Sequence, residues 1–267
     1  MPELPEVETV RRQLAPRLEG TTIVDAGAFA SAKFTPAVEA AGAGIERVDR
    51  RAKYLRFGLD DDRELIVHLG MTGRLEVVDH PDLDHPHLRA WWRLDDTATL
   101  TFHDTRRFGR IHVVDTGDYA DIPTLRDAGP EPWDPELTDA RFAQLLAASR
   151  RPLKTKLLSQ RPIAGVGNIY ADEALWRARI NPRVTRLGLD RAALLLEALR
   201  EVLAAGIDNG GTTLRDYRDA TGATGTNQDR LLVYGHAGRP CARCGTPLRS
   251  AQIDARTTTW CPACQRR

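Results

Sequence analysis

The spacing of apolar residues predicts one short helix followed by a region of strands. Val7, Val10 and Leu14 share one face of a helix, and Pro5 suits its first turn. We expect Pro16 to end or kink this helix. From about residue 21 to residue 115 the segments become short and rich in β-branched and aromatic residues, as strands are. These segments are 22–24, 54–57, 65–68, 75–78, 91–94, 99–102 and 111–114.

The connections between these segments favour a β-sandwich or barrel. The acidic runs 60–62 and 95–96 predict hairpin turns. Too few helical segments separate the strands for a parallel α/β sheet.

The second half of the chain is predicted to be helical. Three prolines fall within residues 129–135, which mark the best candidate for a linker. Helices are expected around 142–146, over 171–179, and from an N-cap at Asp190 to an end marked by Gly206, Gly210 and Gly211. Residues 219–229 have no apolar period and predict a mobile loop.

Charge is distributed unevenly along the 267 residues, although the formal net charge is only +1. Residues 1–149 hold 18 Lys and Arg against 27 Asp and Glu, whereas residues 150–267 hold 20 against 10. A basic second half favours a polyanionic partner, although ordinary surface charge gives the same count. No membrane-spanning apolar run and no signal peptide is found, so we expect a cytoplasmic protein without membrane contact.

The four cysteines form two pairs, Cys241 with Cys244 and Cys261 with Cys264, separated by 16 residues. This spacing is typical of a zinc ribbon, because four thiolates complete a tetrahedral shell. A closed shell leaves no position for a reacting water, so we expect one structural Zn²⁺. Arginines around the ribbon, Arg256 among them, favour contact with phosphates.

Pro2 follows the initiator methionine and has a chemistry of its own. A small residue at position 2 permits removal of Met1, after which Pro2 carries a secondary α-amine. An α-amine titrates near about 8, and its neutral form attacks electrophilic carbons to form an iminium. The adjacent Glu3 is suited to moving protons. A plain solvated terminus fits the same residues.

Segments spread over nearly the whole chain resemble one enzyme family, in the order in which the family has them. The opening PELPEVETV of residues 2–10 is similar to the start of bacterial formamidopyrimidine-DNA glycosylases. The likeness continues in residues 51–55, 68–75, 104–109, 165–171 and 210–214, and it ends with the four-cysteine ribbon.

The resemblance implies an α+β fold and a monomer that binds damaged double-stranded DNA. The implied parts are an N-terminal β-sandwich catalytic domain with flanking helices (1–133), a helical helix-two-turn-helix DNA-binding domain (134–220) and a zinc-ribbon DNA-binding module (230–267). The implied activity is that of a bifunctional DNA glycosylase and AP lyase of base excision repair, which removes 8-oxoguanine and formamidopyrimidines.

The resemblance also implies a role for each matching residue. Pro2 attacks the sugar C1′, expels the base and forms a Schiff base, with Glu3 as the proton-transfer partner, and β,δ-elimination then cuts the strand. Glu6 matches an acidic residue near the active site. The residues that hold the kinked phosphate backbone are Lys53, His68, Asn168 and Arg256, of which Lys53 and Arg256 also count as catalytic.

Three side chains match those that fill the gap left by the flipped nucleotide: Met71, Arg106 and Phe108. An apolar wedge fills such a gap, and Arg106 is suited to hydrogen-bond the orphaned base. By themselves, Met71 and Phe108 also fit a hydrophobic core. His68 likewise fits a buried histidine, and Asn168 a turn.

Two other functions remain open. One is an endonuclease VIII-type glycosylase for oxidised pyrimidines, and Leu4 argues against it. The other is a non-catalytic zinc-ribbon protein that binds damaged DNA, and the presence of Pro2 and Glu3 argues against it. The chain departs from the family pattern at Arg215, often a lysine, and near 226–227, where an aromatic residue is usual. Both departures leave the base preference open.

Overall fold

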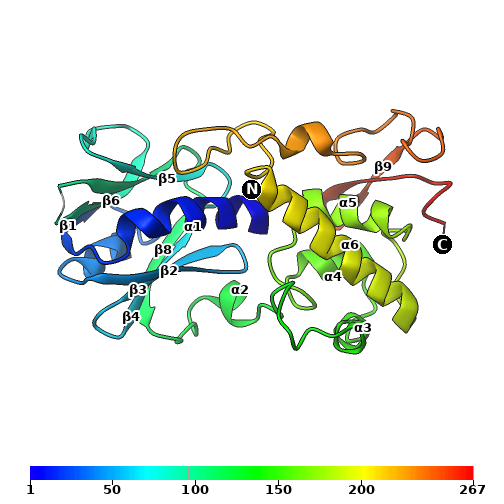
Figure 1. Cartoon of the computed structure of the whole chain (residues 1–267), viewed down its shortest axis with the longest axis horizontal. Helices are drawn as coiled ribbons and strands as arrows, with labels where there is room; N and C mark the ends of the chain where they lie inside the picture. Colours follow the sequence, from blue (N-terminus) through cyan, green and yellow to red (C-terminus); the bar gives the residue numbers. More distant parts are fainter. Residues whose placement is uncertain (96, 267) are drawn as a thin grey trace. The chain divides into compact units, whose positions relative to one another are not determined.

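A computed structural model describes residues 1–95 and 97–266, which form two compact units. Unit 1 comprises Met1–Arg126 and Asn209–Gln228, and unit 2 comprises Asp127–Asp208 and the chain from Asp229 onward. Figure 1 colours the chain from blue at the N-terminus to red at the C-terminus and labels most of its helices and strands. None of the helices in the described part of the chain combines the length and the apolar character that a membrane crossing needs.

Unit 1 is built on two four-stranded antiparallel sheets, as far as its described residues show. One sheet has the order β1-β6-β7-β5 and the other the order β2-β3-β4-β8. The strands are β1 Ile23–Ala28, β2 Ile45–Arg51, β3 Tyr54–Leu59, β4 Arg63–His68, β5 Gly73–Val78, β6 Leu88–Leu94, β7 Thr99–Asp104 and β8 Arg110–Asp115.

The two sheets share one hydrophobic core, which makes them a sandwich. Phe57 of β3 and Leu65 of β4 enter the same buried cluster as Trp92 of β6 and Phe102 of β7. Helix α1 (Leu4–Leu18) and the 3₁₀ helix η1 (Thr35–Ala40) add side chains to this cluster. The N-terminal β-sandwich with flanking helices is therefore confirmed.

The sequence pattern locates seven of these eight strands and the turn at 60–62. It does not predict β2, because five of its seven residues are charged and only Ile45 and Val48 are fully buried. The second predicted turn is 95–96. Asp95 directly follows the last residue of β6, and Asp96 lies outside the described residues.

Pro16 does not end the first helix, because α1 continues to Leu18. That part of the prediction is wrong. Pro16 removes one backbone donor from the last turn. Glu19 N still donates to Ala15 O at 3.0 Å, and Leu14 and Leu18 are buried on the core side. Packing of the apolar face therefore outweighs the missing hydrogen bond.

Unit 2 contains helices α3 to α6 and a β-hairpin. The bounds are α3 Asp139–Ala147, α4 Leu153–Leu158, α5 Asn168–Arg177, α6 Leu189–Asp208, β9 Arg249–Ile253 and β10 Arg256–Trp260. Two shorter helices, α2 Pro123–Arg126 and η2 Asn227–Arg230, lie at the junctions between the units along the chain.

The longest helix, α6, starts before its expected N-cap and ends at Asp208, beyond Gly206 but just before Gly210 and Gly211. Asp190 lies in the first turn of α6, one residue after its start, and Gly206 lies inside the helix. A Cβ at position 206 would meet Tyr170 Oη at 2.5 Å. This glycine therefore allows α5 and α6 to approach closely instead of ending the helix.

Candidate active site and nucleic-acid interface

The first helix fixes the positions of Pro2, Glu3 and Glu6. Glu3 is the N-cap of α1, and its carboxylate accepts the backbone N–H of Glu6 in a capping box. In return, Glu3 N donates to Glu6 Oε2 at 2.7 Å. Pro2 is buried, and Glu3 and Glu6 are only 3% and 1% exposed. Because a capping box satisfies donors that a helix leaves unpaired, the start of the chain is held by its own helix.

Glu6 also ties the segment 210–217 to the start of the chain. Thr212 N donates to Glu6 Oε1 at 2.7 Å, and the Tyr217 hydroxyl donates to Glu6 O at 3.3 Å. Gly211 has a φ of +86°, and a Cβ there would lie 2.9 Å from Glu6 Cγ, so only glycine fits. Burial, followed by the charge of Glu6, raises the pKa of Tyr217, which keeps the phenol a neutral donor.

The α-amine of the chain lies among charged groups of unit 1. Burial lowers the pKa of the Met1 amine below 8.0, Glu3 and Glu6 raise it, and Lys53 lowers it. Lys53 is 7% exposed and lies in the turn between β2 and β3, where Ala52 has a φ of +53°. The fold therefore brings Lys53 and two carboxylates to the start of the chain, where Pro2 follows Met1.

His68 ends β4 beside the turn that carries Lys53. Its partner across the sheet is Tyr54, and the two ring centroids are 4.7 Å apart. Burial, followed by the charges of Lys53 and Arg110, lowers the pKa of His68 to about 4. Its Nδ1 accepts from Gly70 N at 3.2 Å, so the neutral ring carries its proton on Nε2. Such a ring is suited to donate to a phosphate oxygen.

Met71, Arg106 and Phe108 lie on the surface of unit 1. Met71 is 37% exposed and Phe108 is 49% exposed. The guanidinium carbon of Arg106 lies 5.0 Å from the centroid of the Phe108 ring. Exposure excludes the alternative that Met71 and Phe108 fill the core, and exposed apolar side chains of this size are suited to insertion between bases.

A cationic groove of about 530 Å³ opens beside Arg106 in unit 1. Burial, followed by His85 and Arg74, lowers the pKa of His103 to about 4, so this imidazole is neutral at pH 7. Four arginines and three histidines face a single carboxylate, which suits a polyanion. Its ionisable residues are Arg74, Arg106, Arg215, Arg218, His85, His87, His103 and Asp216. Of these, the sequence predicts only Arg106 as a site residue, because the others come together only on folding.

In unit 2, a β-hairpin brings Arg256 close to Asn168. Strands β9 and β10 are joined by Asp254 and Ala255, which have φ values of +47° and +59°. Asn168 is the first residue of α5, and its Nδ2 donates to Thr257 O at 3.2 Å, next to the exposed Arg256. Two of the predicted phosphate-binding residues therefore lie together.

A buried ion pair that the sequence pattern does not predict holds this hairpin to the helices. Lys154 Nζ lies 2.6 Å from Asp172 Oδ1 and donates to Thr257 O at 3.0 Å. Asp172 Oδ2 accepts from Thr259 N at 2.9 Å. The side chains of Lys154 and Asp172 are 0% and 1% exposed. Burial raises the pKa of Asp172, and the Lys154 ammonium counteracts this rise.

Replacing Lys154 by methionine is expected to lower the free energy of unfolding by about 3–5 kcal/mol, because it leaves the Asp172 carboxylate buried without its counter-ion. Urea unfolding of the zinc-loaded protein, followed by tryptophan fluorescence, measures this loss. The matched control is Arg151→Met, which breaks the exposed pair with Asp254 and should cost about 1 kcal/mol or less. Equal stability of the Lys154→Met variant and the control would contradict the prediction.

The four cysteines of the ribbon meet in unit 2. All four Sγ atoms lie within 4.8 Å of one another, and Cys244 Sγ is 3.5 Å from Cys261 Sγ and 3.4 Å from Cys264 Sγ. With Zn–S bonds of about 2.3 Å, the sulfurs of a tetrahedral site are about 3.8 Å apart. The donor set therefore fits one structural Zn²⁺. Trp176 Nε1 donates to Cys241 Sγ at 3.3 Å and ties the ribbon to α5.

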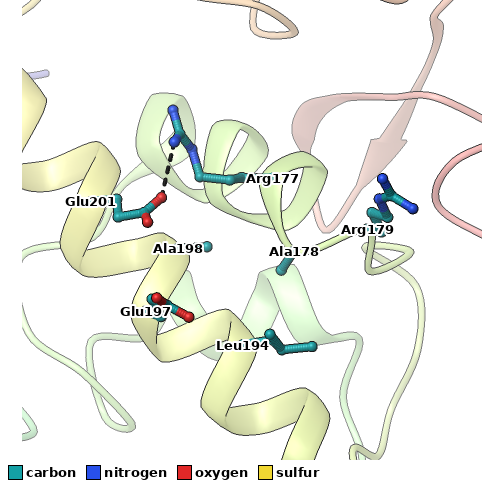
Figure 2. Close-up of a pocket in the computed structure, with 7 residues that line it drawn as sticks. All are labelled: Arg177, Ala178, Arg179, Leu194, Glu197, Ala198 and Glu201. Atoms are coloured by element: carbon teal, nitrogen blue, oxygen red, sulfur yellow. Dashed lines mark hydrogen bonds and ion pairs between the residues drawn. The ribbon is translucent and has the colours of Figure 1, made fainter. Parts of the chain in front are cut away.

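A second hollow, between α5 and α6, has a different character. Figure 2 shows Arg177 turned toward Glu201, with which it pairs at 2.9 Å. Two arginines and two glutamates balance each other there, and no predicted site residue lines the hollow. Its lining is Arg177, Ala178, Arg179, Leu194, Glu197, Ala198 and Glu201.

Comparison with known proteins covers the chain almost from end to end. Three family models match it: the formamidopyrimidine-DNA glycosylase N-terminal domain over residues 1–111, the formamidopyrimidine-DNA glycosylase H2TH domain over 128–218, and a zinc finger found in FPG and IleRS over 238–267. The helix-two-turn-helix part and the zinc ribbon expected from the sequence are thus confirmed.

Individual relatives agree with these matches. The formamidopyrimidine-DNA glycosylase of Deinococcus radiodurans is 46% identical over 99% of this chain and 97% of its own length. The crystal structure of the MutM (Fpg) protein of Thermus thermophilus is similar with a TM-score of 0.91 and 47% identity, over 99% and 98% of the two chains. A complex between a Lactococcus lactis FPG mutant and a Fapy-dG containing DNA gives a TM-score of 0.89 and 36% identity over both full lengths. The chain therefore belongs to the formamidopyrimidine-DNA glycosylase family.

Proposed function

We propose that this protein excises oxidised purines through a Schiff base on Pro2 and then cuts the strand by β,δ-elimination. As a family member it is a DNA glycosylase of base excision repair, and AP lyase activity is a general property of the family. The observation that supports the specific chemistry is the arrangement of Glu3, Glu6 and Lys53 around the Met1 α-amine, directly beside the buried Pro2.

The first step uses the amine that removal of Met1 leaves on Pro2. Its nitrogen bonds to C1′ of the damaged nucleotide and loses its proton, while the bond from C1′ to the base breaks and the base leaves with that electron pair and takes up a proton. Glu3 delivers a proton to the ring oxygen O4′, the C1′–O4′ bond breaks, and an iminium remains. Pro2 is buried next to Lys53, Glu3 and Glu6, and an α-amine that titrates near about 8 has a neutral fraction for this attack at physiological pH.

Strand scission follows from the iminium. Loss of a proton from C2′ expels the 3′ phosphate, and a second elimination expels the 5′ phosphate. The iminium accepts electron density at each step, so no further cofactor is required. The structural zinc takes no part in these steps, since its shell is closed by four thiolates.

Both units supply residues for holding the DNA. In unit 1, Lys53 and His68 are suited to phosphates, and Met71, Arg106 and Phe108 to the gap that the flipped nucleotide leaves. In unit 2, Asn168 and Arg256 share the hairpin contact at Thr257. We also propose that the protein acts as a monomer in the cytoplasm without membrane contact, and that its functional segments are 1–133, 134–220 and 230–267.

Borohydride trapping on three duplexes tests the proposal. We expect a covalent adduct with duplexes that carry 8-oxoguanine or an abasic site, and much less adduct with thymine glycol. Preference for thymine glycol would replace the assignment to oxidised purines by one to oxidised pyrimidines. This alternative is tested because the polar Asn227, which donates to Thr212 Oγ1 at 2.8 Å, stands near the position where the family usually has an aromatic residue. Absence of an adduct on all three duplexes would contradict the lyase chemistry.

A further inference from the structure

The side chains proposed to enter the duplex are carried by two loops that cross between the sheets of the sandwich. Met71 lies in the loop from β4 to β5, and Arg106 and Phe108 lie in the loop from β7 to β8. Strands β4 and β8 belong to one sheet, and β5 and β7 to the other. Two loops that make the same crossing are free to move separately unless something joins them.

The carboxylate of Asp104 joins the two loops. Asp104 ends β7 and has no exposed surface. Its Oδ1 accepts from Thr72 Oγ1 at 2.5 Å and from Arg106 N at 3.2 Å, and its Oδ2 accepts from Gly109 N at 2.7 Å. One buried carboxylate therefore binds the first loop through a hydroxyl and both ends of the second loop through the backbone.

Thr72 has a second contact that makes its hydroxyl specific. Its Oγ1 donates to Asp104 and also accepts from Arg106 N at 3.1 Å. A hydroxyl is both a donor and an acceptor, which a methyl group of the same size is not. Thr72 follows Met71 directly, and Arg106 is itself a proposed insertion residue, so this hydroxyl connects the two proposed insertion sites.

Backbone contacts support the same join from both sides. Gly70 has a φ of +67°, and a Cβ there would lie 2.4 Å from Gly109 N and 2.5 Å from the carbonyl carbon of Phe108. On the other side, the left-handed Arg107, with a φ of +55°, presents its carbonyl to Lys33 Nζ at 2.8 Å. The second loop is therefore clamped between the first loop and Lys33.

We propose that Thr72 and Asp104 are positioning residues that make the two loops one preformed insertion element, so that Met71 and Arg106–Phe108 enter the duplex together. This inference rests on the proposed function. Without the join, the loops must be ordered separately as the base leaves the stack, which adds an entropic cost to flipping. A substrate without a stacked base to replace does not incur that cost.

The matched pair Thr72→Val and Thr72→Ser tests the join. Valine keeps the shape without the hydroxyl, and serine keeps the hydroxyl without the methyl. In single-turnover assays we expect Thr72→Val to excise 8-oxoguanine from a duplex about ten- to a hundredfold more slowly, the effect of losing a hydrogen bond to a buried charge. Thr72→Ser should remain within about threefold of the wild type.

A substrate that needs no insertion distinguishes loss of the join from general damage to the fold, because general damage would slow scission of this substrate as well. Scission of an abasic site in a single-stranded oligonucleotide should proceed at the wild-type rate in both variants. The fluorescence rise of a 2-aminopurine beside the lesion, which follows unstacking, should be slowed only in Thr72→Val. Should the valine variant fail to fold, Thr72→Ala gives the same comparison.

Three results would overturn the inference: wild-type excision by Thr72→Val, equal slowing on the duplex and on the single strand, or no recovery in Thr72→Ser. Failure of the proposed function looks different, because the wild type itself would then not excise 8-oxoguanine from the duplex. The two failures are therefore distinguishable within one experiment.

Discussion

The Pro2→Gly variant should lose borohydride trapping on 8-oxoguanine duplexes almost completely. Glycine replaces the buried secondary amine by a flexible primary one, and it removes the ring that fixes the nitrogen at the start of α1. We expect excision to fall at least about a hundredfold, which corresponds to about 2.7 kcal/mol of lost transition-state stabilisation. Gel-based trapping and single-turnover excision measure the loss.

A second variant separates the amine from the ring. Inserting one serine between Met1 and Pro2 keeps the proline and Glu3 but places the proline nitrogen inside a peptide bond. This variant should still bind the duplex, but its proline nitrogen should form no adduct. Undiminished trapping in either variant would place the nucleophile elsewhere in the chain.

The Cys244→Ser variant should lose zinc and DNA affinity together. Zinc supplies about 10–16 kcal/mol of apparent binding free energy in small zinc-finger peptides, and this energy is folding energy. The ribbon carries the hairpin with Arg256, so we expect duplex affinity to fall about ten- to a hundredfold, as expected for losing a charge-assisted contact. Metal analysis and a binding titration at fixed salt measure the two losses.

The matched control removes a charge near the ribbon and leaves the ligands intact. The Arg239→Gln variant keeps all four thiolates and should retain one zinc per chain, with only a slight change in affinity. Full DNA affinity in metal-free Cys244→Ser would show that the ribbon does not hold the DNA.

The fold was predictable where the signal lies in a few consecutive residues. Seven strands of the sandwich follow from β-branched and aromatic runs. β2 does not, because its charged residues pair with neighbours that sequence does not reveal, as Arg47 does with Glu64 at 3.5 Å. Helix α1 continues past Pro16 and helix α6 continues past Gly206 for the same reason, since tertiary packing outweighs local preference at Leu18 and at Tyr170.

In the candidate site, too, the sequence predicts some residues and not others. The zinc ligands follow from spacing, whereas Pro2 is singled out only by the family resemblance, because its place beside Met1 fits a plain solvated terminus as well. The exposure of Met71 and Phe108 did not follow, because their residue types fit a core equally well. Thr72 and Lys154 are detected only in the folded chain, since Asp104 lies 32 residues from Thr72 and Thr257 lies 103 residues from Lys154. Buried polar partners of this kind have no local sequence signature.

Mapping the trapped adduct tests the covalent role of Pro2 most directly. The protein is reduced with borohydride on an abasic-site duplex, digested with a protease and a nuclease, and analysed by tandem mass spectrometry. The account predicts a peptide that begins at Pro2, lacks Met1 and carries the deoxyribose remnant on its terminal nitrogen. A remnant on a lysine instead, or strand scission by protein that retains Met1 throughout, would contradict it.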